Sequence, residues 1–307
     1  MKKLLFAVLL ITSPIISNSQ EVAPKKPNGY YSNLTLKISY ALGGLKLMDT
    51  DFPLPDNIKE YKDIVYKTVE KKDLKLDIYH QKNISDTTPL IIFIHGGAWK
   101  KGDKHSYWPY LIPYAEKGYI TATIQYRLTG EAIYPAQLND VISAIQWLQE
   151  NANEYHIDKN KIALVGGSAG GHLAMMAAYS DASLKIKGLV NLYGPSDLTT
   201  PYAQQTESVQ KLIGASYQEV PELYKMASPI TYISKDIPPT LTFQGTLDEL
   251  VPYEQSDNLD KKIKEAGAIS YYHKLKGWPH TMDMSVKVNE YCQYYMDEFF
   301  EKYIPKN

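Results

Sequence analysis

The sequence predicts an α/β protein with a mostly parallel central sheet of about eight strands, an antiparallel start and helices on both faces. Two observations lead to this prediction. Short apolar or β-branched runs alternate with longer segments whose apolar residues recur at helical spacing. The run Leu-Ile-Ile-Phe-Ile at residues 90–94 is apolar throughout, which is typical of a strand buried on both faces of a parallel sheet.

Residues 1–19 have the organisation of a secretory signal peptide. Lys2 and Lys3 precede an apolar run over residues 4–16, and small and polar residues follow up to Ser19. The run is shorter than the ~20 residues that span a bilayer. We therefore expect cleavage after Ser19 and no membrane association of the mature chain, with an uncleaved anchor as the alternative. An exported chain without disulfides fits a bacterial periplasm or medium.

Residues 20–60 are rich in Pro, Gly and Asn and predict an irregular N-terminal arm, followed by one α/β domain over residues 61–307. Strands are predicted at residues 64–69, 74–79, 90–94, 120–125, 162–165, 188–192, 240–243 and 270–275. Helices are predicted at residues 137–153, 170–179, 253–265 and 286–303. The first two strands form a hairpin. Residues 197–236 do not follow this alternation of strands and helices, and we predict that they form a small cap-like insertion above the sheet.

Composition excludes several classes of protein. The 33 Lys and Arg against 34 Asp and Glu leave a net charge of −1, which gives no whole-chain electrostatic case for binding nucleic acid or an anionic membrane. The single cysteine, Cys292, excludes an intramolecular disulfide and a cysteine-rich metal site. No two histidines have the spacing of a metal-binding helix, so we predict no metal site. The oligomeric state is left open.

Ser168 is the predicted nucleophile. It lies in Gly166-Gly167-Ser168-Ala169-Gly170-Gly171, between a predicted strand and a predicted helix, which is the context that gives Gly-x-Ser-x-Gly its meaning. A turn this tight leaves no room for Cβ atoms beside the serine. The helix N-terminus then favours developing negative charge. A phosphate-binding glycine loop is disfavoured because the dinucleotide spacing and a P-loop lysine are absent.

His95-Gly96-Gly97-Ala98-Trp99 directly follows the strand predicted at residues 90–94. Paired glycines at a strand end allow backbone N–H groups to turn inward, as an oxyanion hole requires. The expected donors are Gly96 or Gly97 together with Ala169, the residue after the nucleophile. Trp99 is our candidate substrate-binding residue.

Asp248 and His280 are the predicted partners of Ser168. A serine hydroxyl is a weak nucleophile at neutral pH, so it needs a base and an acid that orients the base. Asp248 follows the strand at residues 240–243, and His280 follows the strand at residues 270–275. The chain order Ser, Asp, His is the one expected of an α/β-hydrolase.

Two other titratable residues compete for the roles of acid and base, and a third has a structural role. Glu249 is the rival acid, although its neighbouring position predicts exposure. His273 is the rival base, but it lies within a predicted strand and is more typical of a partly buried core residue. His95 is expected to hold its loop rather than to transfer protons.

From about residue 66 to the C-terminus, the sequence resembles the hormone-sensitive-lipase-like and feruloyl-esterase-like carboxylesterases of the α/β-hydrolase superfamily. The resemblance rests on His95-Gly96-Gly97-Ala98-Trp99, Gly102-Asp103-Lys104, Tyr126-Arg127-Leu128, Pro135-Ala136-Gln137, the segment at residues 166–174 and Ser228-Pro229-Ile230-Thr231-Tyr232. It implies a serine hydrolase with Ser168 as nucleophile, Asp248 as acid and His280 as base, and no cofactor. Two departures from the family pattern occur. Ala98 stands where many members of the family have a third glycine, and Trp278-Pro279 precedes His280 where glycine is commoner. Both bear on the shape of the pocket more than on the chemistry.

Arg127 is the only arginine, and the other 32 basic residues are lysines. A lone guanidinium indicates a position that needs a planar, bidentate donor. The Tyr-Arg-Leu motif of the resemblance fits this interpretation. We predict that Arg127 pairs with a carboxylate, Asp140 or Asp103, and fixes the scaffold beneath the site.

The leading functional prediction is an exported serine carboxylesterase that acts on acetyl or feruloyl esters of plant polysaccharide, a substrate class that rests on analogy. Small acyl esters are the first alternative, which would make the protein a short-chain lipase or esterase. The second alternative is amide hydrolysis, as in the arylformamidases. A non-catalytic binding module is the most remote alternative, because such modules typically lose the nucleophile.

Overall fold

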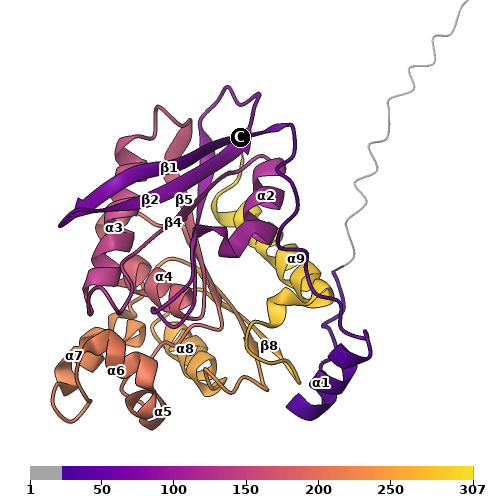
Figure 1. Ribbon diagram of the computed structural model, residues 1–307, viewed down its shortest axis with the longest axis vertical. Coiled ribbons are helices and arrows are strands. Elements are labelled where there is room, and N and C mark those ends of the chain that lie inside the picture. Colours follow the sequence, from indigo (N-terminus) through magenta and orange to yellow (C-terminus); the bar gives the residue numbers. More distant parts are fainter. Residues whose placement is uncertain (1–22, 307) are drawn as a thin grey trace, which may run out of the picture.

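The computed structural model describes residues 23–306, which form an eight-stranded sheet in the order β1-β2-β4-β3-β5-β6-β7-β8 (Figure 1). The strands are β1 (Ile58–Val69), β2 (Lys72–Gln81), β3 (Thr88–Ile94), β4 (Ile120–Ile124), β5 (Ile157–Gly167), β6 (Gly188–Leu192), β7 (Thr240–Gly245) and β8 (Ser270–Leu275). The pairs β1–β2 and β2–β4 are antiparallel, and the later pairs are parallel. The predicted sheet is thus confirmed. The predicted signal peptide, residues 1–19, lies outside the described residues.

Helices cover both faces of this sheet, as predicted. The α-helices are α1 (Asn33–Ala41), α2 (Trp108–Glu116), α3 (Ala136–Glu150), α4 (Ala169–Ser180), α5 (Pro201–Gln205), α6 (Glu207–Ile213), α7 (Pro221–Met226), α8 (Glu254–Glu265) and α9 (Val286–Tyr303). Four short 3₁₀ turns are described as well: η1 (Lys104–Tyr107), η2 (Ala182–Leu184), η3 (Pro229–Tyr232) and η4 (Met282–Met284). No helix within residues 23–306 has the length and apolar character needed to cross a bilayer.

The hydrophobic core has two parts, one on each side of the sheet. Side chains of β3 alternate between them: Ile92 and Ile94 join the cluster with α3 and α4, whereas Ile91 and Phe93 join the cluster with α2 and α9. Figure 1 shows α3 and α4 on one side of the sheet and α2 and α9 on the other. The apolar run at residues 90–94 is therefore buried on both faces, as expected for an inner parallel strand.

Outside the predicted insertion, two helices were not predicted from the sequence: α1 and α2. Pro109 and Pro113 obscured the helical pattern of α2, but Pro109 lies in the first turn, where a backbone N–H has no helical partner to lose. Helix α1 lies within the arm that was predicted to be irregular. Ser32 begins it with a capping box in which its side chain accepts a hydrogen bond from the Thr35 N–H.

The insertion predicted at residues 197–236 contains α5, α6, α7 and η3, between β6 and β7. It contacts the core through buried residues such as Leu212 and Tyr224, and η3 packs against α4. In Figure 1 its helices lie beside α4 and α8 at one end of the sheet. This insertion therefore packs against the helices that flank the C-terminal ends of the inner strands.

Candidate active site

The turn from β5 into α4 brings Ser168 into a strained backbone conformation. Ser168 has φ of +55°, in the left-handed region that residues other than glycine rarely adopt. A Cβ atom on Gly166 would lie 2.3 Å from the Gly170 carbonyl oxygen, and one on Gly170 would lie 1.9 Å from the Ile94 carbonyl oxygen. Only glycine fits at these two positions, which explains the residue types that flank Ser168 in the sequence.

Ser168, His280 and Asp248 form a continuous chain of hydrogen bonds. The Ser168 Oγ lies 2.9 Å from His280 Nε2, and His280 Nδ1 lies 2.7 Å from Asp248 Oδ2. The three residues follow β5, β8 and β7 respectively, at the carboxyl ends of parallel strands in the same half of the sheet. Because these ends meet at one edge of the sheet, residues 112 and 32 positions apart in sequence come into contact.

The Asp248 carboxylate is held by donors on both oxygens. Its Oδ1 accepts hydrogen bonds from the backbone N–H groups of Leu250 and Val251, at 2.9 and 2.8 Å. Its Oδ2 accepts one from Gln244 Nε2 at 2.9 Å, in addition to the bond with His280. Gln244 is fully buried at the end of β7, and no sequence motif marked it. The loop thus fixes the carboxylate relative to the imidazole.

The rival acid and the rival base both lie elsewhere. Glu249 is exposed to solvent, whereas the Asp248 side chain is fully buried. His273 lies within β8 with its ring stacked on Phe243, and its Nδ1 is 2.8 Å from the Tyr291 hydroxyl. Burial lowers the pKa of His273 to about 4. Neither residue belongs to the hydrogen-bonded chain that contains Ser168.

Of the glycines after β3, Gly96 lies directly against Ser168, and Gly97 lines the same cavity as Ser168. A Cβ atom on Gly96 would lie 3.3 Å from the Ser168 Cβ, and Gly97 has φ of +107°. Among the described residues, the backbone N–H groups of Gly96, Gly97 and Ala169 have no hydrogen-bond acceptor. Such unpaired donors beside a nucleophile can bind an oxyanion.

His95 stabilises this loop through hydrogen bonds of its ring and of its carbonyl oxygen. It is 1% exposed, its Nδ1 lies 2.8 Å from the Gly96 carbonyl oxygen, and burial lowers its pKa. This environment agrees with the structural role predicted for it.

Ser168 and His280 open into a cavity of about 460 Å³. Apolar side chains form part of the wall: Met48, Pro109, Leu250 and Met284. The N-terminal arm contributes Met48, because its backbone pairs with the segment after His280: the Met48 N–H donates to the Met284 carbonyl oxygen at 2.8 Å. This volume is that of a small-molecule pocket.

Trp99 does not contribute to this cavity, contrary to the prediction that it binds substrate. Its side chain is 3% exposed and belongs to the core, and its ring packs edge-on against His172 with centroids 5.2 Å apart. Trp99 has φ of +56°, in the left-handed region, within the tight loop that follows β3. The tight loop therefore turns the indole inward, which sequence proximity to Gly96 and Gly97 did not reveal.

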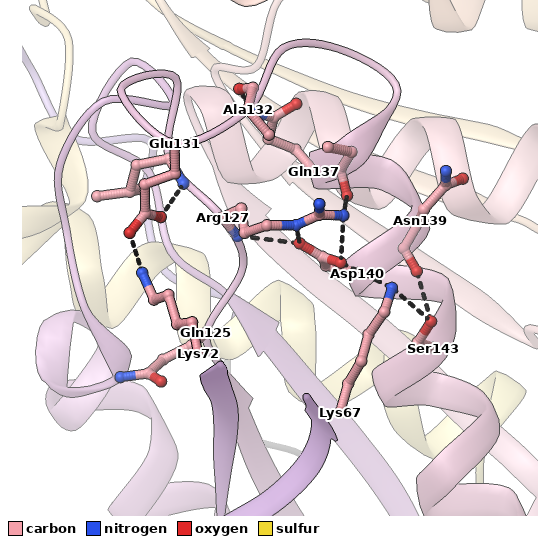
Figure 2. A network of polar contacts seen from close by, with 12 residues as sticks. Lys67, Lys72, Gln125, Arg127, Glu131, Ala132, Gln137, Asn139, Asp140 and Ser143 are labelled. Carbon is pink, nitrogen blue, oxygen red and sulfur yellow. Dashed lines mark hydrogen bonds and ion pairs between the residues drawn. The ribbon is translucent and has the colours of Figure 1, made fainter. Parts of the chain in front are cut away.

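Arg127 pairs with Asp140, one of its two predicted partners (Figure 2). The guanidinium donates from Nε to Oδ2 at 2.7 Å and from Nη2 to Oδ1 at 2.9 Å, and the fully buried Asp140 also accepts from Lys67 Nζ at 2.8 Å. Hydrogen bonding to Asp140 raises the pKa of Arg127. Asp103, the other predicted partner, instead caps η1. The pair ties the loop after β4 to α3, behind the site.

Comparison with known proteins finds a family model and several esterases that are similar to this chain. Residues 76–263 match the model of the BD-FAE family. The esterase LipQ of Mycobacterium tuberculosis is 31% identical over 245 residues, which cover 74% of this chain and 58% of LipQ. The chain spans little more than half the length of the curated relatives that it matches.

Solved structures show the same fold. A truncated carbohydrate esterase from gut microbiota is 27% identical, with a TM-score of 0.70 over 81% of this chain and 98% of that one. The propionate-bound esterase Est2 of Thermogutta terrifontis is 25% identical, with a TM-score of 0.68 over 80% of this chain and 94% of that one. These likenesses confirm the predicted α/β-hydrolase fold.

Proposed function

Because this chain belongs to the BD-FAE family, and its fold is that of the α/β-hydrolases, we propose that it is a carboxylesterase with Ser168, His280 and Asp248 as its catalytic triad. The observation that carries this proposal is the hydrogen-bonded chain from Ser168 Oγ through His280 to Asp248, which ends at a cavity. A buried carboxylate on one side of the imidazole and a serine hydroxyl on the other is the arrangement that activates a serine nucleophile.

Acylation starts with Ser168 Oγ attacking the ester carbonyl carbon while its proton moves to His280 Nε2. Asp248 accepts the Nδ1–H and stabilises the imidazolium. The Ala169 N–H and that of Gly96 or Gly97 donate to the oxyanion of the tetrahedral intermediate. The intermediate then expels the alcohol, which takes the proton from His280, and the acyl group stays on Ser168.

Deacylation uses the same groups in reverse order. His280 takes a proton from water, the resulting nucleophile attacks the acyl carbon, and a second tetrahedral intermediate forms in the same oxyanion site. Its collapse releases the carboxylic acid and returns the proton to Ser168 Oγ.

The substrates of the proposed esterase are acetyl or feruloyl esters of plant polysaccharide. The similarity of this chain to a carbohydrate esterase supports a carbohydrate ester as the substrate. The cavity of about 460 Å³ has the size of a small-molecule site, which is compatible with an acetyl or a feruloyl ester. The proposal includes export, which is tested by N-terminal sequencing of the protein from the culture medium and the periplasm: a mature chain that begins at Gln20 is the expected result.

The test is hydrolysis by the purified mature protein of a matched panel: p-nitrophenyl acetate, butyrate and octanoate, methyl ferulate, acetylated xylan and N-formylkynurenine. Ser168→Ala abolishes turnover, whereas Ser183→Ala, an exposed serine outside the cavity, serves as the control and keeps it. Release of acetate or ferulate as the dominant activity supports the polysaccharide esters. Preference for p-nitrophenyl butyrate or octanoate, or for N-formylkynurenine, would replace that substrate class. Turnover that Ser168→Ala leaves unchanged would overturn the triad.

A further inference from the structure

Asp283 is a second carboxylate in the wall of the cavity that contains Ser168 and His280. It lies in η4, three residues after His280, and is 2% exposed. The Tyr193 hydroxyl donates to its Oδ1 at 2.6 Å, and the Tyr110 hydroxyl donates to its Oδ2 at 3.1 Å. No motif in the sequence pointed to this residue, and the proposed reaction does not use it.

This carboxylate lacks the basic partner that the other buried carboxylates of the described residues have. Asp77 pairs with Lys104, Asp140 with Arg127 and Lys67, and Asp248 with His280. Within residues 23–306, no lysine, arginine or histidine nitrogen lies within 4.0 Å of the Asp283 carboxylate. Burying such a group is unfavourable. Accordingly, burial raises the pKa of Asp283, although the two tyrosine hydroxyls, the Asp283 backbone N–H and the more distant charge of His280 act in the opposite direction.

Asp283 retains capacity for a further hydrogen bond. A carboxylate offers about four acceptor positions, and the two tyrosine hydroxyls use one on each oxygen. Asp283, Tyr193 and Tyr110 all line the cavity, together with the polar side chain of Asn289. One part of the cavity wall is therefore a buried polar subsite, in contrast to the apolar part around Met48 and Leu250.

We propose that Asp283, Tyr193 and Tyr110 form a subsite that accepts a hydrogen bond from a hydroxyl group of the ester substrate. This inference rests on the proposed esterase function and names the chemistry of its substrate. A hydroxyl donor suits the subsite better than an ammonium does, because Lys101 lines the same cavity and disfavours a second cation there. The hydroxyl belongs either to the acyl group, as in a phenolic acid, or to the alcohol, as in a sugar.

A buried acceptor discriminates strongly against a substrate that lacks the donor, because binding the wrong substrate leaves the acceptor without water and without a partner. We expect kcat/KM to favour the hydroxylated ester by about 10- to 100-fold over an ester with a methyl group or hydrogen in its place. The discrimination depends on the Asp283 carboxylate, and therefore falls toward unity in Asp283→Asn.

The experiment measures kcat/KM for two matched pairs of esters. Methyl 4-hydroxycinnamate against methyl 4-methylcinnamate places the hydroxyl on the acyl side, and mono-O-acetylated methyl xyloside against tetrahydropyran-3-yl acetate places it on the alcohol side. The pair with discrimination identifies the source of the hydroxyl. Asp257→Asn is the control outside the cavity: Asp257 also accepts a tyrosine hydroxyl, from Tyr272 at 2.9 Å, but it is partly exposed and pairs with Lys274.

Asp283→Asn is expected to remove the discrimination in one pair, because the hydroxylated ester loses more kcat/KM than its partner without a hydroxyl. Equal losses for both members of each pair would show that Asp283 only holds the loop, and would overturn the proposal. So would the absence of discrimination in the wild type, or preference for an ester that carries an ammonium group. Ser168-dependent hydrolysis of the esters without hydroxyls tests the esterase function separately from this subsite.

Tyr110→Phe provides a second variant if Asp283→Asn does not fold. This substitution removes the donor to Asp283 Oδ2 but keeps the carboxylate. The Oδ2 atom then has the substrate hydroxyl as its remaining hydrogen-bond donor. We therefore expect discrimination to rise in Tyr110→Phe. Unchanged or reduced discrimination would contradict the role of Asp283 as the acceptor.

Discussion

The Tyr126 hydroxyl donates a hydrogen bond of 2.8 Å to the carbonyl oxygen of His95, and the two rings stack with centroids 4.3 Å apart. This contact joins the loop after β4 to the glycine loop beside Ser168. Arg127, the next residue in the chain, fixes the same loop to α3 through Asp140. The only arginine of the sequence thus holds a segment that in turn supports the predicted oxyanion donors.

Arg127→Lys tests this support. A lysine retains the charge but loses the two parallel hydrogen bonds to Asp140, which is fully buried. We expect the free energy of unfolding to fall by about 2 kcal/mol and kcat/KM to fall with it, because the loop under His95 is less fixed. Urea denaturation and ester hydrolysis measure the two effects. Lys72→Ala, which removes an exposed ion pair with Glu131 on the same surface, is the control and should change little. An Arg127→Lys variant with wild-type stability and activity would contradict the prediction.

Gly170→Ala is expected to prevent folding or to destabilise the protein by at least about 3 kcal/mol. The new Cβ atom would lie 1.9 Å from the Ile94 carbonyl oxygen and 2.7 Å from that of His95, and this backbone belongs to the centre of the sheet. Gly130→Ala is the matched control, because no atom lies within 4 Å of its Cβ position. Soluble yield and thermal melting distinguish the two variants. Similar melting temperatures for both would show that the nucleophile turn tolerates a side chain.

Gln244→Leu tests whether the donor to Asp248 positions the triad. The substitution removes the bond from Gln244 Nε2 to Asp248 Oδ2 and leaves the Ser256 hydroxyl without its acceptor on Gln244. We expect kcat to fall by about 10-fold with little change in KM, because Asp248 orients His280 less well. Gln255→Leu is the control: Gln255 is equally buried but bonds to Ser196 and Asp197 rather than to the triad. It should lower stability and keep kcat. Equal kinetic losses in the two variants would indicate a general packing effect.

The stability of the protein is expected to fall as the pH decreases from about 6.5 to about 4, in part because of His172. Burial lowers the pKa of His172 to about 4, and its Nε2 donates to the Ala227 carbonyl oxygen at 2.7 Å. In the unfolded chain, a histidine has a pKa near 6.5. Between these two values the unfolded state binds a proton that the native state does not bind, so acid favours unfolding. The effect reaches about 3 kcal/mol at pH 4.

His172→Gln keeps a donor for Ala227 and removes the titrating group. Urea denaturation at pH 7.5, 6 and 5 should therefore show a smaller loss of unfolding free energy with acid in this variant than in the wild type. His273, whose pKa burial also lowers to about 4, contributes to the slope that remains. Parallel pH profiles of the two proteins would contradict the assignment.

The local pattern of the sequence determined most of the elements. All eight predicted strands and four predicted helices occur within the described residues, because apolar periodicity reflects which faces are buried. The exceptions have local causes. Two prolines obscured α2, and the capping box at Ser32 did not stand out in a segment rich in Pro and Gly. The glycines around Ser168 were also predictable, since a tight strand-to-helix turn admits few residue types.

Only the tertiary structure decided which side chains meet. The sequence offered Asp140 and Asp103 equally to Arg127, but the loop after β4 brings Arg127 against α3 and leaves Asp103 to cap η1. It placed Trp99 beside the oxyanion glycines, whereas the backbone turn directs the indole into the core. It gave no sign of Asp283, whose partners Tyr193 and Tyr110 lie 90 and 173 positions away in the chain. It gave none of Gln244 either: its partner Asp248 is only four positions away, but their contact depends on how the loop after β7 folds back. Periodicity and motifs encode local conformation, but the pairing of buried polar groups depends on which strand ends and loops the folded sheet brings together.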